Sequence, residues 1–182
     1  MRQGLWQTGV GFDLAGKVLG IVGLRRIGSR IAAFGNQLGM RVVAWSANLT
    51  ERRATASGAG YTPLDDLFKQ SDNVILQLRL SERTKGIITA RHISLMRSSA
   101  CLVNTARGQL SDEAALVIAL RENRIRGAAL AVFQWEPLPT DHPLRSLENV
   151  VLTQHMGYVS VESYDQFFRQ AVENIEAYLE GR

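Results

Sequence analysis

Lys17-Val-Leu-Gly-Ile-Val-Gly-Leu-Arg-Arg-Ile-Gly28 decides the fold of this chain. Its first half, Lys17–Val22, is a short apolar run, which is typical of a buried parallel strand. Glycines then interrupt the run, and apolar residues recur at helical spacing up to Gly39, where we expect the helix to end. The residues Arg41–Trp45 form the next predicted strand. One strand–helix–strand unit therefore fits into roughly 30 residues, the size of a dinucleotide-binding unit.

The turn between this strand and helix has two of the three glycines of a dinucleotide-binding turn. The first glycine allows a sharp bend, the second lets the backbone approach a pyrophosphate, and the third lets helix and strand pack closely. Gly23 and Gly28 fill the first and third places, and Arg25 stands at the second. Arg25, Arg26 and Arg30 also crowd the helix N-terminus, where uncompensated cations cost about 0.3–1 kcal/mol each. Two interpretations stay open: an anion held at this helix end, or solvated surface arginines.

Length and composition are those of one ordinary globular unit. The 182 residues are 46% hydrophobic and 21% charged, with a net charge of +4. We expect a lead segment at 1–13, with Trp6 and Phe12 packing on a single domain at 14–182. The chain has no apolar run of membrane-spanning length and no signal-peptide pattern, so we expect no membrane partner and a cytoplasmic location. Its arginines are scattered, which argues against nucleic acid as a partner, whereas the positive charge favours small anionic ligands.

The single cysteine and two of the histidines offer little chemistry. Cys101 lies in an apolar run, so we expect a buried, inert thiol. His92 and His142 have no pattern around them beyond packing or surface roles, and we predict no metal site.

Strands and helices alternate along the rest of the chain. Further strands are predicted at 73–77, 100–104, 127–133 and 150–153, and helices at 50–56, 63–68 after Thr62 as N-cap, 90–96, 113–123 after Ser111 as cap, and 161–179. Such alternation is typical of a parallel sheet covered on both faces. We therefore predict an α/β fold, a Rossmann-type doubly wound parallel sheet with helices on both faces.

Several stretches together resemble the NAD(P)-binding domain of the D-isomer-specific 2-hydroxyacid dehydrogenases. Their order and spacing agree over nearly the whole chain, and the stretches are Leu14–Leu24, Val103–Gly108, Gly127–Phe133, Glu136–Pro139 and Asn149–Gly157. The segments Ala44–Thr50 and His155–Tyr158 are similar to a bacterial branch of this family.

The resemblance implies reversible hydride transfer between a nicotinamide cofactor and a 2-hydroxy or 2-keto acid. It assigns Arg107 to the carboxylate and carbonyl oxygens of the acid, His155 to general acid–base catalysis, and Glu136 to pairing with His155. A planar guanidinium suits two oxygens at once, and histidine titrates near neutrality. Taken singly, the three have other interpretations: a surface residue at a strand end, a hydrogen-bonded histidine and a solvated loop acid.

The resemblance also implies a set of cofactor-binding residues for NAD or NADP: Gly23, Arg25, Arg26, Ile27, Gly28, Ser46, Asn48, Arg52, Gln77, Thr84, Thr105, Ala106, Ala131 and Gly157. Four positions depart from the family pattern: Arg25 replaces a glycine, Gln77-Leu-Arg79 stands where the family commonly has a histidine and often a proline lining the cofactor, Ala131 replaces an aspartate, and Gln154 replaces a proline. We expect Arg25 to occupy pyrophosphate space, so that Arg25→Gly would tighten dinucleotide binding.

The second strand ends at Ser46, where an acid would accept the adenosine ribose hydroxyls and repel a 2′-phosphate. Ser46 and Asn48 remove that repulsion, and Arg52 and Arg53 add positive charge, so the sequence leaves the choice between NAD and NADP open.

Enzymes of this family carry a second, substrate-binding domain, which we expect to be absent from this chain. A cofactor domain alone leaves the nicotinamide open to water and lacks the positioning that hydride transfer needs. We therefore expect the isolated chain to be inactive, and to form a homodimer through the cofactor domain. The alternative is a non-catalytic, decayed module that binds a nucleotide or another protein.

Overall fold

The computed structural model describes residues 4, 6 and 11–182, so most of the predicted lead segment lies outside the described residues. Seven parallel strands form one sheet in the order β3-β2-β1-β4-β5-β6-β7. The strands are β1 (Val18–Val22), β2 (Arg41–Trp45), β3 (Gly60–Tyr61), β4 (Asn73–Leu76), β5 (Cys101–Asn104), β6 (Gly127–Leu130) and β7 (Val150–Leu152). The chain runs outward from β1 to β3 and returns to β4 on the other side of β1. The predicted Rossmann-type fold is thus confirmed, and its strand order reverses between β1 and β4.

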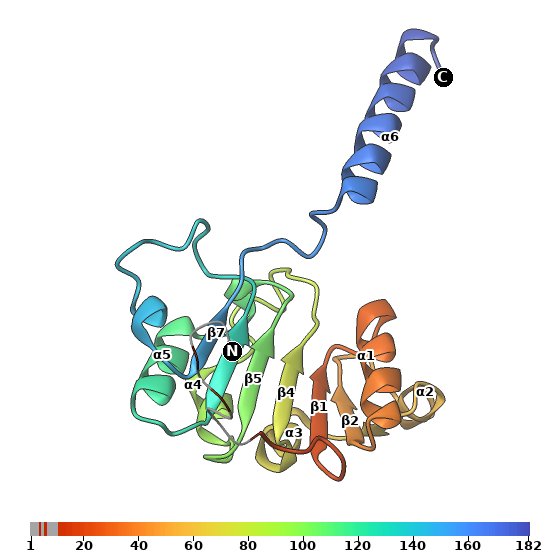
Figure 1. The fold of residues 1–182 in the computed structure, drawn as a ribbon. Coiled ribbons are helices and arrows are strands. Elements are labelled where there is room, and N and C mark those ends of the chain that lie inside the picture. Colours follow the sequence, from red (N-terminus) through yellow and green to blue (C-terminus); the bar gives the residue numbers. More distant parts are fainter. Residues whose placement is uncertain (1–3, 5, 7–10) are drawn as a thin grey trace.

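Helices lie on both faces of the sheet (Figure 1). The helices α1 (Arg26–Gln37) and α2 (Glu51–Ala56) cover one face, and α3 (Leu64–Gln70), α4 (Ala90–Ser94) and α5 (Glu113–Arg121) cover the other. Two short 3-10 helices, η1 (Gly108–Leu110) and η2 (Pro143–Ser146), lie in the connections, and α6 (Val161–Leu179) ends the chain. None of the described helices combines the length and apolar character needed to cross a bilayer.

The alternation of side chains along β1 divides the core into two layers. Val18 and Val22 pack with Leu67 and Phe68 of α3 on one face of the sheet. Leu19 and Ile21 belong to the other face, which α1 covers. All five β1 residues are buried, as expected for the central strand of a parallel sheet. The two-sided burial of β1 fixes the position of the glycine turn that follows it.

Two predicted helix caps are wrong by one residue. The helix α5 begins after Asp112, whose carboxylate accepts the backbone N–H of Ala115 at 2.9 Å. Ser111 is buried instead, and its backbone forms an isolated parallel β-bridge with Ile88. Pro63 occupies the N-cap position of α3, and the hydroxyl of Thr62 accepts a hydrogen bond from the Gln70 amide at 3.2 Å. Ser111 and Asp112 can both cap a helix, and the burial of Ser111 leaves the position to Asp112. At α3 the Thr62 hydroxyl is instead used by Gln70.

Both ends of the described chain are largely exposed. Trp6 and Phe12, which were expected to pack on the domain, are 71% and 68% exposed, and the guanidinium carbon of Arg126 lies 3.5 Å from the centroid of the Phe12 ring. The helix α6 has the predicted bounds, but it projects away from the sheet (Figure 1), and none of its residues is buried. Its periodicity predicts a helix and says nothing of what the apolar side covers.

Candidate active site

The glycine turn after β1 is held by close backbone contacts at Gly23 and Gly28. Gly23 has φ +110°, and a Cβ there would lie 2.6 Å from the carbonyl carbon of Gln77. A Cβ at Gly28 would lie 2.1 Å from the carbonyl oxygen of Gly23. The first glycine therefore brings the turn against the end of β4, and the second lets α1 sit directly on the turn.

Arg25 is the N-cap residue of α1 and has extended backbone, with φ −115° and ψ −154°. Any residue adopts this conformation, so the fold does not require a glycine at position 25. Its N–H donates to the carbonyl oxygen of Gly23 at 3.2 Å, and its side chain is exposed.

A cavity of about 470 Å³ opens between the start of α1 and the ends of β4 and β5. Most of the residues around it are predicted site residues. Leu78 and Arg79 belong to the stretch that the resemblance places at the cofactor but were not listed as site residues, and Leu80 was missed because a loop residue carries no periodic signal. The amide of Gln77 donates to the hydroxyl of Thr105 at 2.6 Å and so joins the ends of β4 and β5. The lining consists of Arg25, Arg26, Ile27, Gly28, Gln77, Leu78, Arg79, Leu80, Thr105, Ala106 and Arg107.

Other predicted cofactor residues lie outside this lining, and several of them brace the loops around it. The hydroxyl of Ser46 accepts the N–H of Leu24 at 2.9 Å, which ties the end of β2 to the glycine turn. The hydroxyl of Thr84 accepts the N–H of Ser81 at 2.8 Å and donates to the carbonyl oxygen of Arg79 at 2.7 Å. The remaining residues outside the lining are Gly23, Asn48, Arg52, Ala131 and Gly157.

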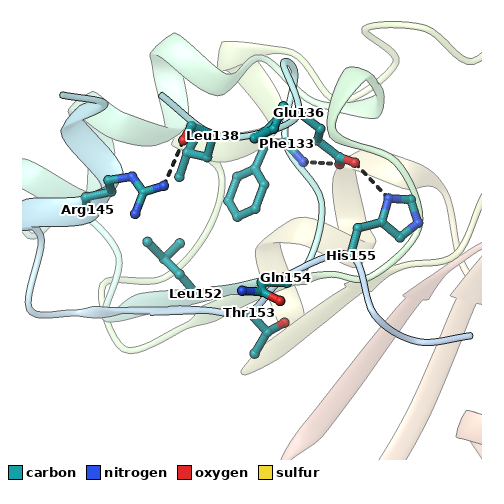
Figure 2. Close-up of a pocket in the computed structure, with 9 residues that line it drawn as sticks. Phe133, Glu136, Leu138, Arg145, Leu152, Thr153, Gln154 and His155 are labelled. Atoms are coloured by element: carbon teal, nitrogen blue, oxygen red, sulfur yellow. Dashed lines mark hydrogen bonds and ion pairs between the residues drawn. The ribbon is translucent and has the colours of Figure 1, made fainter. Parts of the chain in front are cut away.

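His155 and Glu136, which are far apart in sequence, form a close pair (Figure 2). The Nδ1 atom of His155 lies 2.8 Å from Oε2 of Glu136, and Oε1 of Glu136 accepts the N–H of Phe133 at 2.9 Å. Burial raises the pKa of Glu136, but the Phe133 N–H, His155 and the charge of Arg107 together hold it below its ordinary value. Glu136 is therefore a carboxylate at neutral pH, placed to hold one nitrogen of the His155 ring.

Arg107 sits in a turn that the buried side chain of Asn104 fixes. The amide of Asn104 donates to the carbonyl oxygen of Arg107 at 2.9 Å, and its oxygen accepts the N–H of Ala106 at 3.1 Å. Asn104 is 1% exposed, and sequence reasoning gave it no role. An asparagine at a strand end followed by a tight turn is a signal that could have found it.

Gly108 brings the Arg107 turn against the segment that carries Glu136. A Cβ at Gly108 would lie 2.0 Å from the carbonyl carbon of Phe133, so only glycine allows this approach. Since the N–H of Phe133 binds Glu136, the backbone contact links all three predicted catalytic residues.

A second cavity, of about 600 Å³, lies beside the His155–Glu136 pair (Figure 2). Its walls are largely apolar, with Phe133, Leu138 and Leu152, and Gln154 lies in its lining. The guanidinium of Arg145 donates to the carbonyl oxygens of Leu138 and Pro139, both at 2.7 Å, and so holds the loop after Glu136 in place.

Tyr158 and Cys101 complete the surroundings. The ring of Tyr158 meets the His155 ring edge-on, with centroids 6.1 Å apart, a contact that sequence reasoning did not include. Cys101 is half-buried rather than buried, and burial raises the pKa of its thiol, which agrees with an inert cysteine. No cluster of three or more metal-ligating side chains occurs among residues 4, 6 and 11–182.

Comparison with known proteins decides the family. The family described as "D-isomer specific 2-hydroxyacid dehydrogenase, NAD binding domain" matches residues 1–157. The chain belongs to this family and is its NAD-binding domain. It is 41% identical to the glyoxylate reductase of Aeropyrum pernix over 173 residues, which are 95% of this chain and 52% of that protein. The chain therefore spans about half the length of the curated relatives it matches.

Solved 2-hydroxyacid dehydrogenase structures share the fold. The phosphoglycerate oxidoreductase of Vibrio cholerae O395 superposes with a TM-score of 0.91 at 36% identity, covering all of this chain and 59% of that one. The D-lactate dehydrogenase of Aquifex aeolicus, solved with NAD and lactic acid, gives a TM-score of 0.81 at 32% identity, covering 94% of this chain and 56% of that one.

The residues of this NAD-binding domain fit a dinucleotide. The close contacts at Gly23 and Gly28 hold the glycine turn directly before α1, where the first N–H groups of a helix have no partner within the helix. Such a helix end binds phosphate, and the cavity beside it is lined by arginines.

Proposed function

We propose that this NAD-binding domain serves an oxidoreductase that transfers hydride between NAD or NADP and a small 2-hydroxy or 2-keto acid. The observation that carries this proposal is the 2.8 Å pair of His155 and Glu136, to which Arg107 of the 470 Å³ cavity is joined through the contact of Gly108 with Phe133. The relatives named glyoxylate reductase support a 2-keto acid as substrate.

Each of the three side chains has a task in this proposed reaction. Arg107 binds the carboxylate of the acid, because a guanidinium matches two oxygens. Glu136 accepts a hydrogen bond from the Nδ1–H of His155 and remains a carboxylate, which leaves Nε2 to give a proton to the carbonyl oxygen during reduction and to take it back during oxidation. The bound nicotinamide supplies or accepts the hydride.

The first test is binding of the cofactor. We expect calorimetric titration of the chain with NAD+, NADH and NADPH at low salt to give micromolar affinity for one of them, roughly −8 kcal/mol. The preferred ligand decides between NAD and NADP. Failure of all three to bind at millimolar concentration would contradict the proposal and favour the non-catalytic module.

The second test is turnover in a complete enzyme. The side chains of His155 and Glu136 are 36% and 35% exposed, so water reaches them, and we expect the isolated chain to reduce no glyoxylate. A chimera that joins this chain to the other half of the Aeropyrum pernix glyoxylate reductase is expected to consume NADH with glyoxylate. His155→Ala in the chimera should slow turnover by about 10²–10⁴-fold. An unaffected rate in that variant would remove His155 from the mechanism.

We propose further that the domain forms a homodimer and resides in the cytoplasm. Ile27, Phe34 and Leu38 lie on one side of α1 and are 62%, 64% and 53% exposed, which supports an apolar contact between two copies. A single cysteine allows no disulfide within the chain, and cytoplasmic proteins rarely contain one.

A further inference from the structure

Three arginines stand at equivalent places beyond three neighbouring strands. Leu76 of β4 is the register partner of Val22 in β1 and of Asn104 in β5. Arg25, Arg79 and Arg107 each follow one of these partners by three residues. Because adjacent strands lie about 4.8 Å apart, the parallel sheet brings the three arginines to one edge. All three line the 470 Å³ cavity.

The charge around this cavity is unbalanced. Arg26 adds a fourth guanidinium, and the described residues that line the cavity include no aspartate or glutamate. Within residues 4, 6 and 11–182, none of the four arginines forms an ion pair with a carboxylate. The N-terminus of α1 adds further partial positive charge. Like charges within a Debye length, about 8 Å, repel one another, so the arrangement favours entry of an anion.

The arginines differ in what else their loops contact. Arg107 precedes Gly108, whose backbone meets Phe133, and the N–H of Phe133 binds Glu136. Arg25 caps α1, and Arg79 comes from the loop after β4, which Gly23 approaches closely at Gln77. Arg25 and Arg79 therefore line the same cavity from two different loops that meet at Gly23 and Gln77.

We propose that Arg25 and Arg79 form a guanidinium pair that binds the pyrophosphate of the dinucleotide. This inference rests on the proposed function for its ligand and goes beyond it in assigning the phosphate contacts. Position 25 needs no glycine for its backbone, so the arginine replaces a close backbone approach by a side-chain contact with the anion. The proposal reverses the expectation from sequence that Arg25 obstructs the phosphates.

The test uses two probes, NADH and inorganic pyrophosphate, in calorimetric titrations of the 182-residue chain. We expect Arg25→Gly and Arg79→Ala each to weaken binding of both probes about tenfold or more, with Arg79→Lys losing less than Arg79→Ala. Arg83→Ala is the matched control, because Arg83 is exposed in the neighbouring loop and lies outside the cavity lining. Circular dichroism establishes that each variant is folded.

The outcomes separate the guanidinium pair from the proposed function. Tighter or unchanged binding of NADH by Arg25→Gly and Arg79→Ala overturns the pair and leaves the proposed function standing. If pyrophosphate binds in a way that depends on both arginines but NADH does not bind, the pair is supported as an anion site, and the proposal that its ligand is a dinucleotide is overturned. If the unchanged chain binds neither probe, both are overturned.

Discussion

At the scale of the residue, Glu136 stands out because both of its carboxylate oxygens have partners. One carboxylate oxygen accepts the Phe133 N–H, and the other meets His155. These contacts favour the charged form, and they hold the pKa of Glu136 below its ordinary value of about 4.5 against the effect of burial. The carboxylate is thus fixed as an anion by the backbone of its own loop.

This lowered pKa predicts a pH-dependent contribution of Glu136 to stability. A group with a lower pKa in the folded state stabilises fully above its unfolded pKa, and loses that contribution as the pH falls through the folded value. We expect the stability of the unchanged chain to fall more steeply than that of Glu136→Gln below about pH 5. Chemical denaturation at a series of pH values measures this, and parallel curves for the two proteins would contradict it.

We predict that Gly108, which follows Arg107 in the turn after β5, does not tolerate substitution. The Cβ of Gly108→Ala would lie 2.0 Å from backbone atoms of Phe133, so backbone must move, at a cost of about 3 kcal/mol or more in stability. Gly157→Ala is the matched control, because a Cβ there meets nothing within 4 Å, and its effect should stay within about 0.5 kcal/mol. Equal unfolding free energies for the two variants would show that the turn relaxes.

Predictions for single residues succeed where only one residue type can meet the structural requirement of the position. Gly23 and Gly28 lie where backbone contacts exclude a side chain, and His155 meets Glu136 as the resemblance implied. Ser46 and Thr84 show the limit, because their hydroxyls bind loop backbone, and a short polar side chain gives no sign of which partner it will find.

At the scale of the element, periodicity predicted nearly every strand and helix but not their ends. Strands such as β6 end earlier than the apolar run from Gly127 to Phe133, because the chain leaves the sheet at Leu130 to form the Phe133–Glu136 turn. An apolar run indicates that residues are buried, not that they form a strand. Buried loop residues such as Val132 and Phe133 therefore made the predicted strand too long.

The helix α6 illustrates a second limit. Its spacing predicted a helix, and the helix forms, but no α6 residue belongs to either core layer, and the family match ends at residue 157. We expect a chain that ends at Val159 to keep its free energy of unfolding within about 1 kcal/mol. Denaturation by urea measures this, and a loss of several kcal/mol would mean that α6 packs on the domain in solution.

At the scale of the whole molecule, two apolar surfaces are exposed, one on α1 and one on α6. Phe34 on α1 is 64% exposed and Phe168 on α6 is 69% exposed. If the homodimer forms through the α1 surface, Phe34→Asp should yield monomers, while Phe168→Asp stays dimeric. Sedimentation equilibrium distinguishes them, and the opposite result would transfer the interface to α6.

Trp135 stands next to Glu136 and is 75% exposed. An indole in water emits at longer wavelengths than one in an apolar environment, so this residue is an optical reporter built into the edge of the active site. Any partner that closes over Glu136 and His155 should shift its emission toward the blue. In a Trp6→Phe background the half-buried Trp45 supplies a nearly constant reference signal. Assembly of a complete site could then be followed in real time without any added label.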